Sequence, residues 1–203
     1  MDKKLTIINI ALVLVAIFLA YMVYHSISQP VIFENAKRAR EEKVVQNLKG
    51  IRDAQDLFKE EYNRYTASFD SLIAFVKTGQ LPIVNRIQDP NDTTFTKTID
   101  SIVGYINVMD SLQNKYPSLN FETFRYIPFS EPRQEFDIQA GYITRGGMNV
   151  PVFEIKAHYN TYLIGLDKQR IRNEAAQREN VNKYPGMKVG SMTEPSTDGN
   201  WEN

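Results

Sequence analysis

The hydrophobic positions of this chain begin with one uninterrupted run close to its N-terminus. Residues 5–24, LTIINIALVLVAIFLAYMVY, contain no charged side chain. A helix of 20 residues rises about 30 Å, which is the thickness of a bilayer's hydrocarbon core. Tyr21 and Tyr24 close the run, as is typical of aromatic residues at a membrane interface. The pattern predicts a transmembrane helix over residues 5–25.

The charges that flank this run bear on its orientation. Lys3 and Lys4 precede it, which favours an N-terminus that stays in the cytoplasm. Basic residues also follow the apolar run, close enough to influence its orientation, and they are interleaved with glutamates. These basic residues are Lys37, Arg38, Arg40 and Lys43. We expect a single-pass inner-membrane protein with residues 1–4 cytoplasmic and the C-terminal domain periplasmic.

A cleaved secretory signal peptide is the alternative to a retained anchor. The small residues of Ser26-Ile27-Ser28 precede Gln29, where a signal peptidase could cut. The apolar run is longer than the usual signal core of about 7–15 residues, which favours retention. In either case we expect the domain that follows to be exported.

Apolar residues at helical spacing continue beyond the membrane run. Pro30 can occupy the first turn of a helix, and from there no further proline occurs until Pro82. One apolar stripe follows, made of Val44, Leu48, Ile51, Phe58, Tyr62 and Tyr65. The pattern predicts an amphipathic helix over residues 26–66, called the stalk here, exposed over Val31–Val45 and held on a core from Val44 onward.

The remaining pattern predicts an α+β domain over residues 67–186. A short helix is expected over residues 72–76, and Asp167 can cap another over residues 168–179. A further helix is expected over residues 98–112, with one apolar face: Ile99, Ile102, Val103, Ile106, Met109 and Leu112.

From Phe121 the apolar spacing changes to the alternation typical of strands. One strand is expected over residues 121–128, and two more form an antiparallel hairpin over residues 135–159, turning at Gly146-Gly147. Residues 187–203 are expected to form a tail with little apolar material. Trp201, the single tryptophan, is the expected anchor that docks this tail.

Composition narrows the classes of function. The 203 residues carry 24 Lys and Arg against 24 Asp and Glu, so no overall field attracts nucleic acid. The chain contains no cysteine, which excludes disulfides, thiolate metal sites and a cysteine nucleophile. A hydrophobic content of 42% is ordinary for a folded domain.

Residues that could carry chemistry are scattered. His25 and His158 have no metal-ligand partner at helical or loop spacing, and we expect both to be structural. Asp89, Asn91 and Asp92 could contribute to a calcium site, but the loop of residues 89–94 lacks the spacing of an EF-hand. No phosphate-binding, hydrolase or zinc-protease motif occurs. We therefore expect no enzyme, no cofactor and no metal site.

One stretch of the stalk resembles a known family. Ile51-Arg52-Asp53-Ala54-Gln55 is followed by Phe58, by Tyr62-Asn63-Arg64-Tyr65-Thr66 and by Phe69-Asp70-Ser71-Leu72. This order resembles type IV pilins and type II secretion pseudopilins, in which an Ala-Gln pair precedes an aromatic helix end. The resemblance implies an N-terminal helix packed on a small antiparallel sheet. It covers about residues 44–80, and the remainder is similar in architecture only.

The N-terminal segment departs from the pattern of that family. No acidic residue lies between Leu5 and Ser28, and the Gly or Ala cleavage residue followed by Phe is not present. We therefore expect a pilin-like protein without a recognisable prepilin cleavage motif.

Two classes of function follow from the sequence. The first is a membrane-anchored, non-enzymatic structural subunit of a pilin-like secretion or motility assembly. Its partners are membrane lipid and other subunits, with Asn9 as the candidate contact between transmembrane helices. The alternative is an exported monomeric binding module whose N-terminal segment is a cleaved signal peptide.

Overall fold

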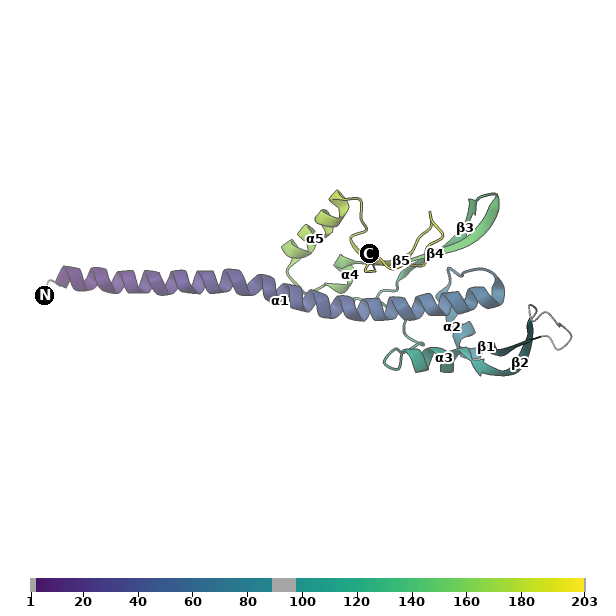
Figure 1. The fold of residues 1–203 in the computed structure, drawn as a ribbon. Helices are drawn as coiled ribbons and strands as arrows, with labels where there is room; N and C mark the ends of the chain where they lie inside the picture. Colours follow the sequence, from purple (N-terminus) through teal and green to yellow (C-terminus); the bar gives the residue numbers. More distant parts are fainter. Residues whose placement is uncertain (1–2, 89–97, 203) are drawn as a thin grey trace. The chain divides into compact units, whose positions relative to one another are not determined.

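The computed structural model describes residues 3–88 and 98–202 and comprises two compact units, Met1–Glu41 and Glu42–Asn203. The chain is α+β, with one long N-terminal helix followed by small antiparallel sheets. Helix α1 runs from Lys3 to Tyr62 (Figure 1). Pro30 lies inside α1, and the N-terminal apolar helix continues into the stalk as predicted.

The first unit is the N-terminal part of α1, and the second is a folded domain that uses the C-terminal part of α1 as its core. Val44, Leu48 and Ile51 are fully buried in this domain, and Phe58 is nearly so. Tyr62 is 50% exposed, so its expected core position was wrong. The ring of Tyr62 instead lies against those of Phe58 and Phe75, with centroids 4.5 and 5.8 Å away, at the border of the core.

The end of α1 is fixed by a buried pair of hydrogen bonds. Asn63 takes a left-handed conformation, φ 54°, which terminates the helix. The side chain of Gln55 then reaches the turn that follows, where its Nε2 donates to Thr66 O over 2.6 Å and its Oε1 accepts from Thr66 N over 3.1 Å. Gln55 is fully buried, and the backbone of Thr66 provides a hydrogen-bond partner for both the nitrogen and the oxygen of its side-chain amide.

Helix α2, Phe69–Thr78, follows directly and contains the expected short helix. The Ser68 hydroxyl caps it by accepting from Ser71 N over 3.3 Å. Its apolar face buries Phe69, Leu72 and Phe75, so residues 69–78 continue the core that α1 begins.

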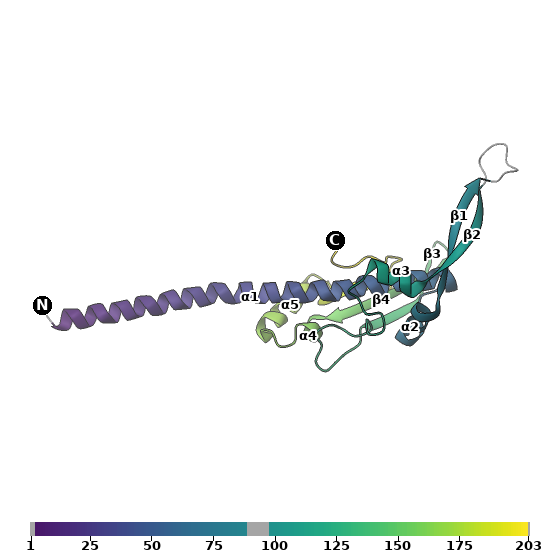
Figure 2. The same ribbon diagram turned by 90° about the horizontal axis from the view of Figure 1, so that it is seen from below.

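The helix expected over residues 98–112 was wrong for most of its length. Strand β1, Gln80–Gln88, pairs antiparallel with strand β2, Thr98–Asn107, and only then does helix α3, Val108–Lys115, begin. The β-branched residues and Gly104 of this segment fit a strand, and pairing with β1 satisfies their backbone. Figure 2 shows this hairpin extending away from α2 and α3.

The predicted hairpin over residues 135–159 is confirmed. Strand β3, Asp137–Arg145, pairs antiparallel with strand β4, Met148–His158. Gly146 and Gly147 form the turn with φ of 58° and 79°, which a side chain would resist.

The expected tail contains a strand. Strand β5, Gly186–Gly190, pairs antiparallel with Glu154–His158 of β4 and completes the order β3-β4-β5. Met187 and Val189 of β5 are buried, so two apolar side chains are enough to hold this strand on the core. Gly190, at φ 76°, lets the chain fold back so that its N–H donates to Asp198 O over 3.0 Å.

Among the remaining segments, one predicted strand is absent and one predicted helix is confirmed. Residues 121–128 form turns with one bridge, Tyr126 to Glu135, so the strand expected there was wrong. Helix α4, Tyr159–Tyr162, is a single turn. Helix α5, Lys168–Asn180, is confirmed together with its cap, since Asp167 accepts from Gln169 N and Arg170 N, both over 2.9 Å.

The buried amide of Gln55 generates a stability prediction. In Gln55→Leu, the N–H and C=O of Thr66 lose their side-chain partner inside the core, so we expect the free energy of unfolding to fall by about 2–5 kcal/mol. Urea unfolding of the full chain in detergent, followed by circular dichroism, measures this. Gln46 offers a matched control because its amide donates to Ser118 Oγ at the surface, and Gln46→Leu should change stability by no more than about 0.5 kcal/mol. Equal losses in the two variants would contradict this role of Gln55.

Candidate membrane anchor and assembly surface

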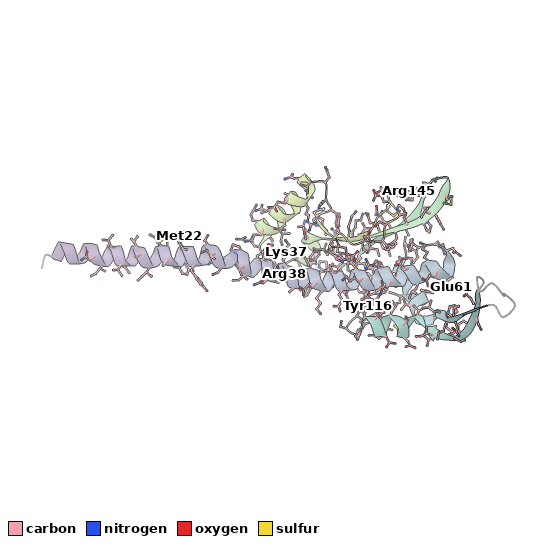
Figure 3. All side chains as sticks on the ribbon, in the orientation of Figure 1. Met22, Lys37, Arg38, Glu61, Tyr116 and Arg145 are labelled. Carbon is pink, nitrogen blue, oxygen red and sulfur yellow. The ribbon has the colours of Figure 1, made fainter. Side chains whose placement is uncertain are left out.

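The N-terminal part of α1 presents apolar side chains in every direction. The large apolar residues from Ile10 to Tyr24 are each 53–71% exposed, and Figure 3 shows Met22 projecting outward among them. Within the described residues, α1 is the one helix long and apolar enough to cross a membrane. A helix that is apolar on all sides needs an apolar surrounding, which makes this segment compatible with a membrane anchor.

Asn9 lies on a distinct face of this helix. At about 100° per residue, Asn9, Ala16 and Ala20 project to the same side, whereas Ala11 projects to the other. All four side chains are exposed in the single chain. Small residues let two helices approach closely in lipid, and an asparagine amide can hydrogen-bond between them. This face therefore has the composition of a contact between transmembrane helices.

The exposed part of the stalk is shorter than the sequence indicated. Val31 and Ile32 are more than half exposed, as expected. Val44 is fully buried in the folded domain, so the exposed segment ends before the predicted limit at Val45. The remaining predicted core positions were described above with α1.

Hydrogen bonds from the neighbours of the predicted anchor Trp201 hold the tail. Trp201 is partly exposed. Asn200 Nδ2 donates to Gly186 O over 2.9 Å, and Asn200 Oδ1 accepts from Lys188 N over 3.1 Å. Glu202 accepts from Arg52 of α1, with Nη1 to Oε1 at 2.9 Å. Sequence reasoning missed these residues, because neither asparagine nor an exposed glutamate stands out in a polar tail.

Two acidic residues of α1 bind tyrosines of the domain. Asp53 accepts from the Tyr116 hydroxyl over 2.8 Å, and Asp56 accepts from the Tyr65 hydroxyl over 3.2 Å. Burial raises the pKa of Asp56, and the hydrogen bond from Tyr65 opposes that rise. Burial and the neighbouring aspartates also raise the pKa of both tyrosines, which keeps them protonated as donors. These pairs fasten α1 within the domain.

Neither histidine is placed as a metal ligand. His25 stacks on Tyr21, with ring centroids 6.0 Å apart. His158 caps α4, since its Nδ1 accepts from Asn160 N over 3.0 Å. Burial lowers the pKa of His158, and the charge of Glu179 acts in the opposite direction. Within residues 3–88 and 98–202, no cluster of three acidic or histidine residues could hold a metal ion.

The calcium-site residues considered above, Asp89, Asn91 and Asp92, lie outside the described residues. The described domain also has a hollow of about 290 Å³ beside α5, lined by Ile164, Gly165, Lys168 and Arg172 among others. A larger hollow of about 510 Å³ lies beside Arg178 and Trp201.

The charged cluster on the β3-β4-β5 sheet is built around Glu154. Its carboxylate lies 3.0 Å from Lys156 Nζ and 3.1 Å from Lys188 Nζ, and Lys156 Nζ also lies 3.4 Å from Asp137. Burial alone would raise the pKa of Glu154, but the hydrogen bonds from Lys156 and Lys188 outweigh it and lower the pKa. Glu154 and Lys156 belong to β4 and Lys188 belongs to β5. The ion pair between Glu154 and Lys188 therefore links the two strands.

Comparisons with known proteins identify no relative. No protein-family model matches this chain, and searches of curated proteins and of solved structures give no significant match.

The lowered pKa of Glu154 predicts how stability depends on pH. A carboxylate whose pKa is lowered on folding stabilises the native state above its ordinary pKa of 4.5, and this contribution is lost as the pH falls through the lowered value. Glu154→Gln should cost about 1–3 kcal/mol at pH 7 because it leaves two lysines without their shared partner. The loss should shrink when unfolding is measured between about pH 4.5 and pH 3.

A matched control for this prediction is Glu122→Gln. Glu122 lies 2.7 Å from Lys77, but both side chains are exposed, so its removal should not change stability measurably at either pH. A pH-independent loss in Glu154→Gln would contradict the electrostatic role of the cluster.

Proposed function

We propose that this protein is a single-pass membrane protein whose folded domain serves as a structural subunit of a pilin-like envelope assembly. The observation that carries the proposal is the change in α1 along its length. The helix is apolar and exposed on all sides from Ile10 to Tyr24, and from Val44 it is one-sided and buried in the folded domain. One helix thus supplies both a membrane segment and a domain core.

Membrane insertion is the burial that the first segment requires. Twelve large apolar side chains between Ile10 and Tyr24 are more than half exposed in the single chain, far more than soluble monomers leave in contact with water. The absence of charge from residues 5–24 lets all of them enter a hydrocarbon core. The lysines at positions 3 and 4 favour a cytoplasmic N-terminus and a periplasmic domain.

A structural role is favoured over an enzymatic one by the use of the polar groups. Asp53, Asp56 and Glu154 each hold another element of the same domain through the hydrogen bonds described above. The Ala54-Gln55 pair that carries the pilin resemblance is itself fully buried and closes the turn after α1. These groups maintain the domain, and the face of Asn9 offers a contact with further subunits.

The anchor is tested by the fate of the N-terminal segment. We expect the protein to remain in the membrane fraction after alkaline carbonate extraction and to float with vesicles. Its intact mass should include the residues before Gln29, because the apolar run is too long for a signal core. A soluble protein with a mass that begins at Gln29 would overturn the anchored subunit and leave the exported binding module.

The helix contact is tested within the membrane. Asn9→Leu removes a hydrogen bond worth about 0.6–2 kcal/mol between helices in lipid, so association should weaken about 3- to 30-fold. Ala16→Leu should weaken it as well, because a larger side chain separates the two backbones. Energy transfer between labelled full-length chains in vesicles measures this association as the lipid-to-protein ratio is varied.

The control for the helix contact is Ala11→Leu, which makes the same change on the opposite side of α1 and should leave association unchanged. Equal effects of Ala11→Leu and Ala16→Leu would contradict a specific face. Association that none of the variants alters would place the contact elsewhere in the chain.

A further inference from the structure

The β1–β2 hairpin leaves the outer edge of β2 open. The two strands form a sheet of their own, and in the described part of the chain β2 pairs with β1 alone. Along Ser101–Asn107 the backbone groups on the side away from β1 therefore meet no other strand. An open edge of this kind pairs readily with an added strand.

The two edges of the hairpin differ in their chemistry. The part of β1 opposite Ser101–Asn107 carries Pro82, which cannot donate to a ladder. Residues 101–107 of β2, SIVGYIN, contain no charge and no proline. Charges, prolines and bulges protect exposed edges, and these seven residues of β2 have no charge and no proline but do contain the bulge at Val103. Its edge is thus the one suited to pairing.

Apolar side chains accompany this open edge. Ile102, Val103 and Tyr105 are 56%, 62% and 62% exposed, and Ile83 and Val84 of β1 are each 47% exposed. Ile102, Tyr105 and Val84 lie on one face of the hairpin, and Ile83 lies on the other.

The register makes β2 complementary to itself. Tyr105 lies opposite Pro82 and Ile102 lies opposite Val84, and these two β1 residues share a face because they are two apart. The bulge between Ile83 and Val84 thereby places Ile102 and Tyr105, three apart, on one face. An antiparallel second β2 can then set Ile102 against Tyr105 and Tyr105 against Ile102, which are favourable cross-strand pairs.

We propose that β2 pairs antiparallel with β2 of a second copy of this chain, so that two hairpins form one four-stranded sheet about a two-fold axis. This pairing names one contact between subunits of the proposed assembly, and it rests on the proposed function in one respect. Anchoring confines copies to one membrane and raises their effective concentration, so that an interface of minimal area suffices. The contact is isologous, since the same seven residues serve both copies.

The absence of cysteine makes this pairing directly testable. With Ile102 opposite Tyr105, the axis passes between positions 103 and 104, which brings the two Val103 residues within the Cα separation that a disulfide bridges. We expect Val103→Cys, as the full chain in membranes, to form a disulfide-linked dimer on mild oxidation. Met148→Cys is the matched control, because Met148 is 70% exposed at the turn of the other hairpin. The dimer yield of Val103→Cys should exceed that of the control at least five-fold.

A charge on the shared face provides the second variant. Adding Tyr105→Lys to Val103→Cys should reduce the dimer yield to that of the control, since it places a charge against an apolar partner in each copy. Adding Met148→Lys should leave the yield unchanged. An unaltered circular dichroism spectrum and melting temperature establish that each variant is folded.

The outcomes separate this inference from the proposed function. Membrane-bound Val103→Cys protein that forms no more dimer than Met148→Cys overturns the β2 pairing and leaves the anchor intact. A dimer that persists with Tyr105→Lys also overturns it. Disulfide formation by protein recovered in the soluble fraction would support the pairing and refute the anchor. A mixed disulfide with a different protein, without the dimer, counts against a second copy as the partner.

Discussion

The fold of the domain depends on the hydrogen bonds that pair the buried backbone of Thr66 in the turn after α1. Where α1 ends, Asn63 reverses the chain and Thr66 is buried beside the helix it has just left. A buried peptide group without partners would make that reversal costly. Gln55 removes the cost by pairing with both polar groups of Thr66. Helix α2 and the aromatic core of Phe58, Phe69 and Phe75 can then form against α1, and the turn to β1 follows from the end of α2.

Helix α1 keeps one secondary structure while the distribution of its apolar side chains changes along its length. Backbone hydrogen bonds within a helix are equally satisfied in lipid and in water, so the same conformation continues from Lys3 to Tyr62. What changes is the distribution of apolar side chains, which surround the helix up to Tyr24 and form one stripe from Val44. Helix α1 therefore contributes to both units of the protein, and no loop separates its two parts.

The sequence predicted those elements whose local signals agreed with one another. The α5 cap at Asp167 and the Gly146-Gly147 turn of the hairpin were marked by specific residues, and both are present; the α1 stripe is buried except at Tyr62. The segment of residues 98–112 failed because its apolar spacing fits a helix as well as a strand, and pairing with the distant β1 decided between them. Strand β5 was missed because two buried residues, Met187 and Val189, give too short a pattern. For the candidate assembly surface, the anchor segment was evident from composition, whereas the open edge of β2 became visible only with the strand assignment.

The attachment of residues 198–202 to α1 has a consequence for the order in which the domain can form. Arg52 holds Glu202, 150 positions later in the chain, and Asn200 and Asp198 hydrogen-bond to β5. A ribosome or a translocation channel releases the chain from the N-terminus, so α1 emerges long before the strand that completes its sheet. The buried face of the helix must therefore remain uncovered until nearly the whole chain has been delivered. The core face of α1 is thus exposed during synthesis and is covered only when the last strand is in place.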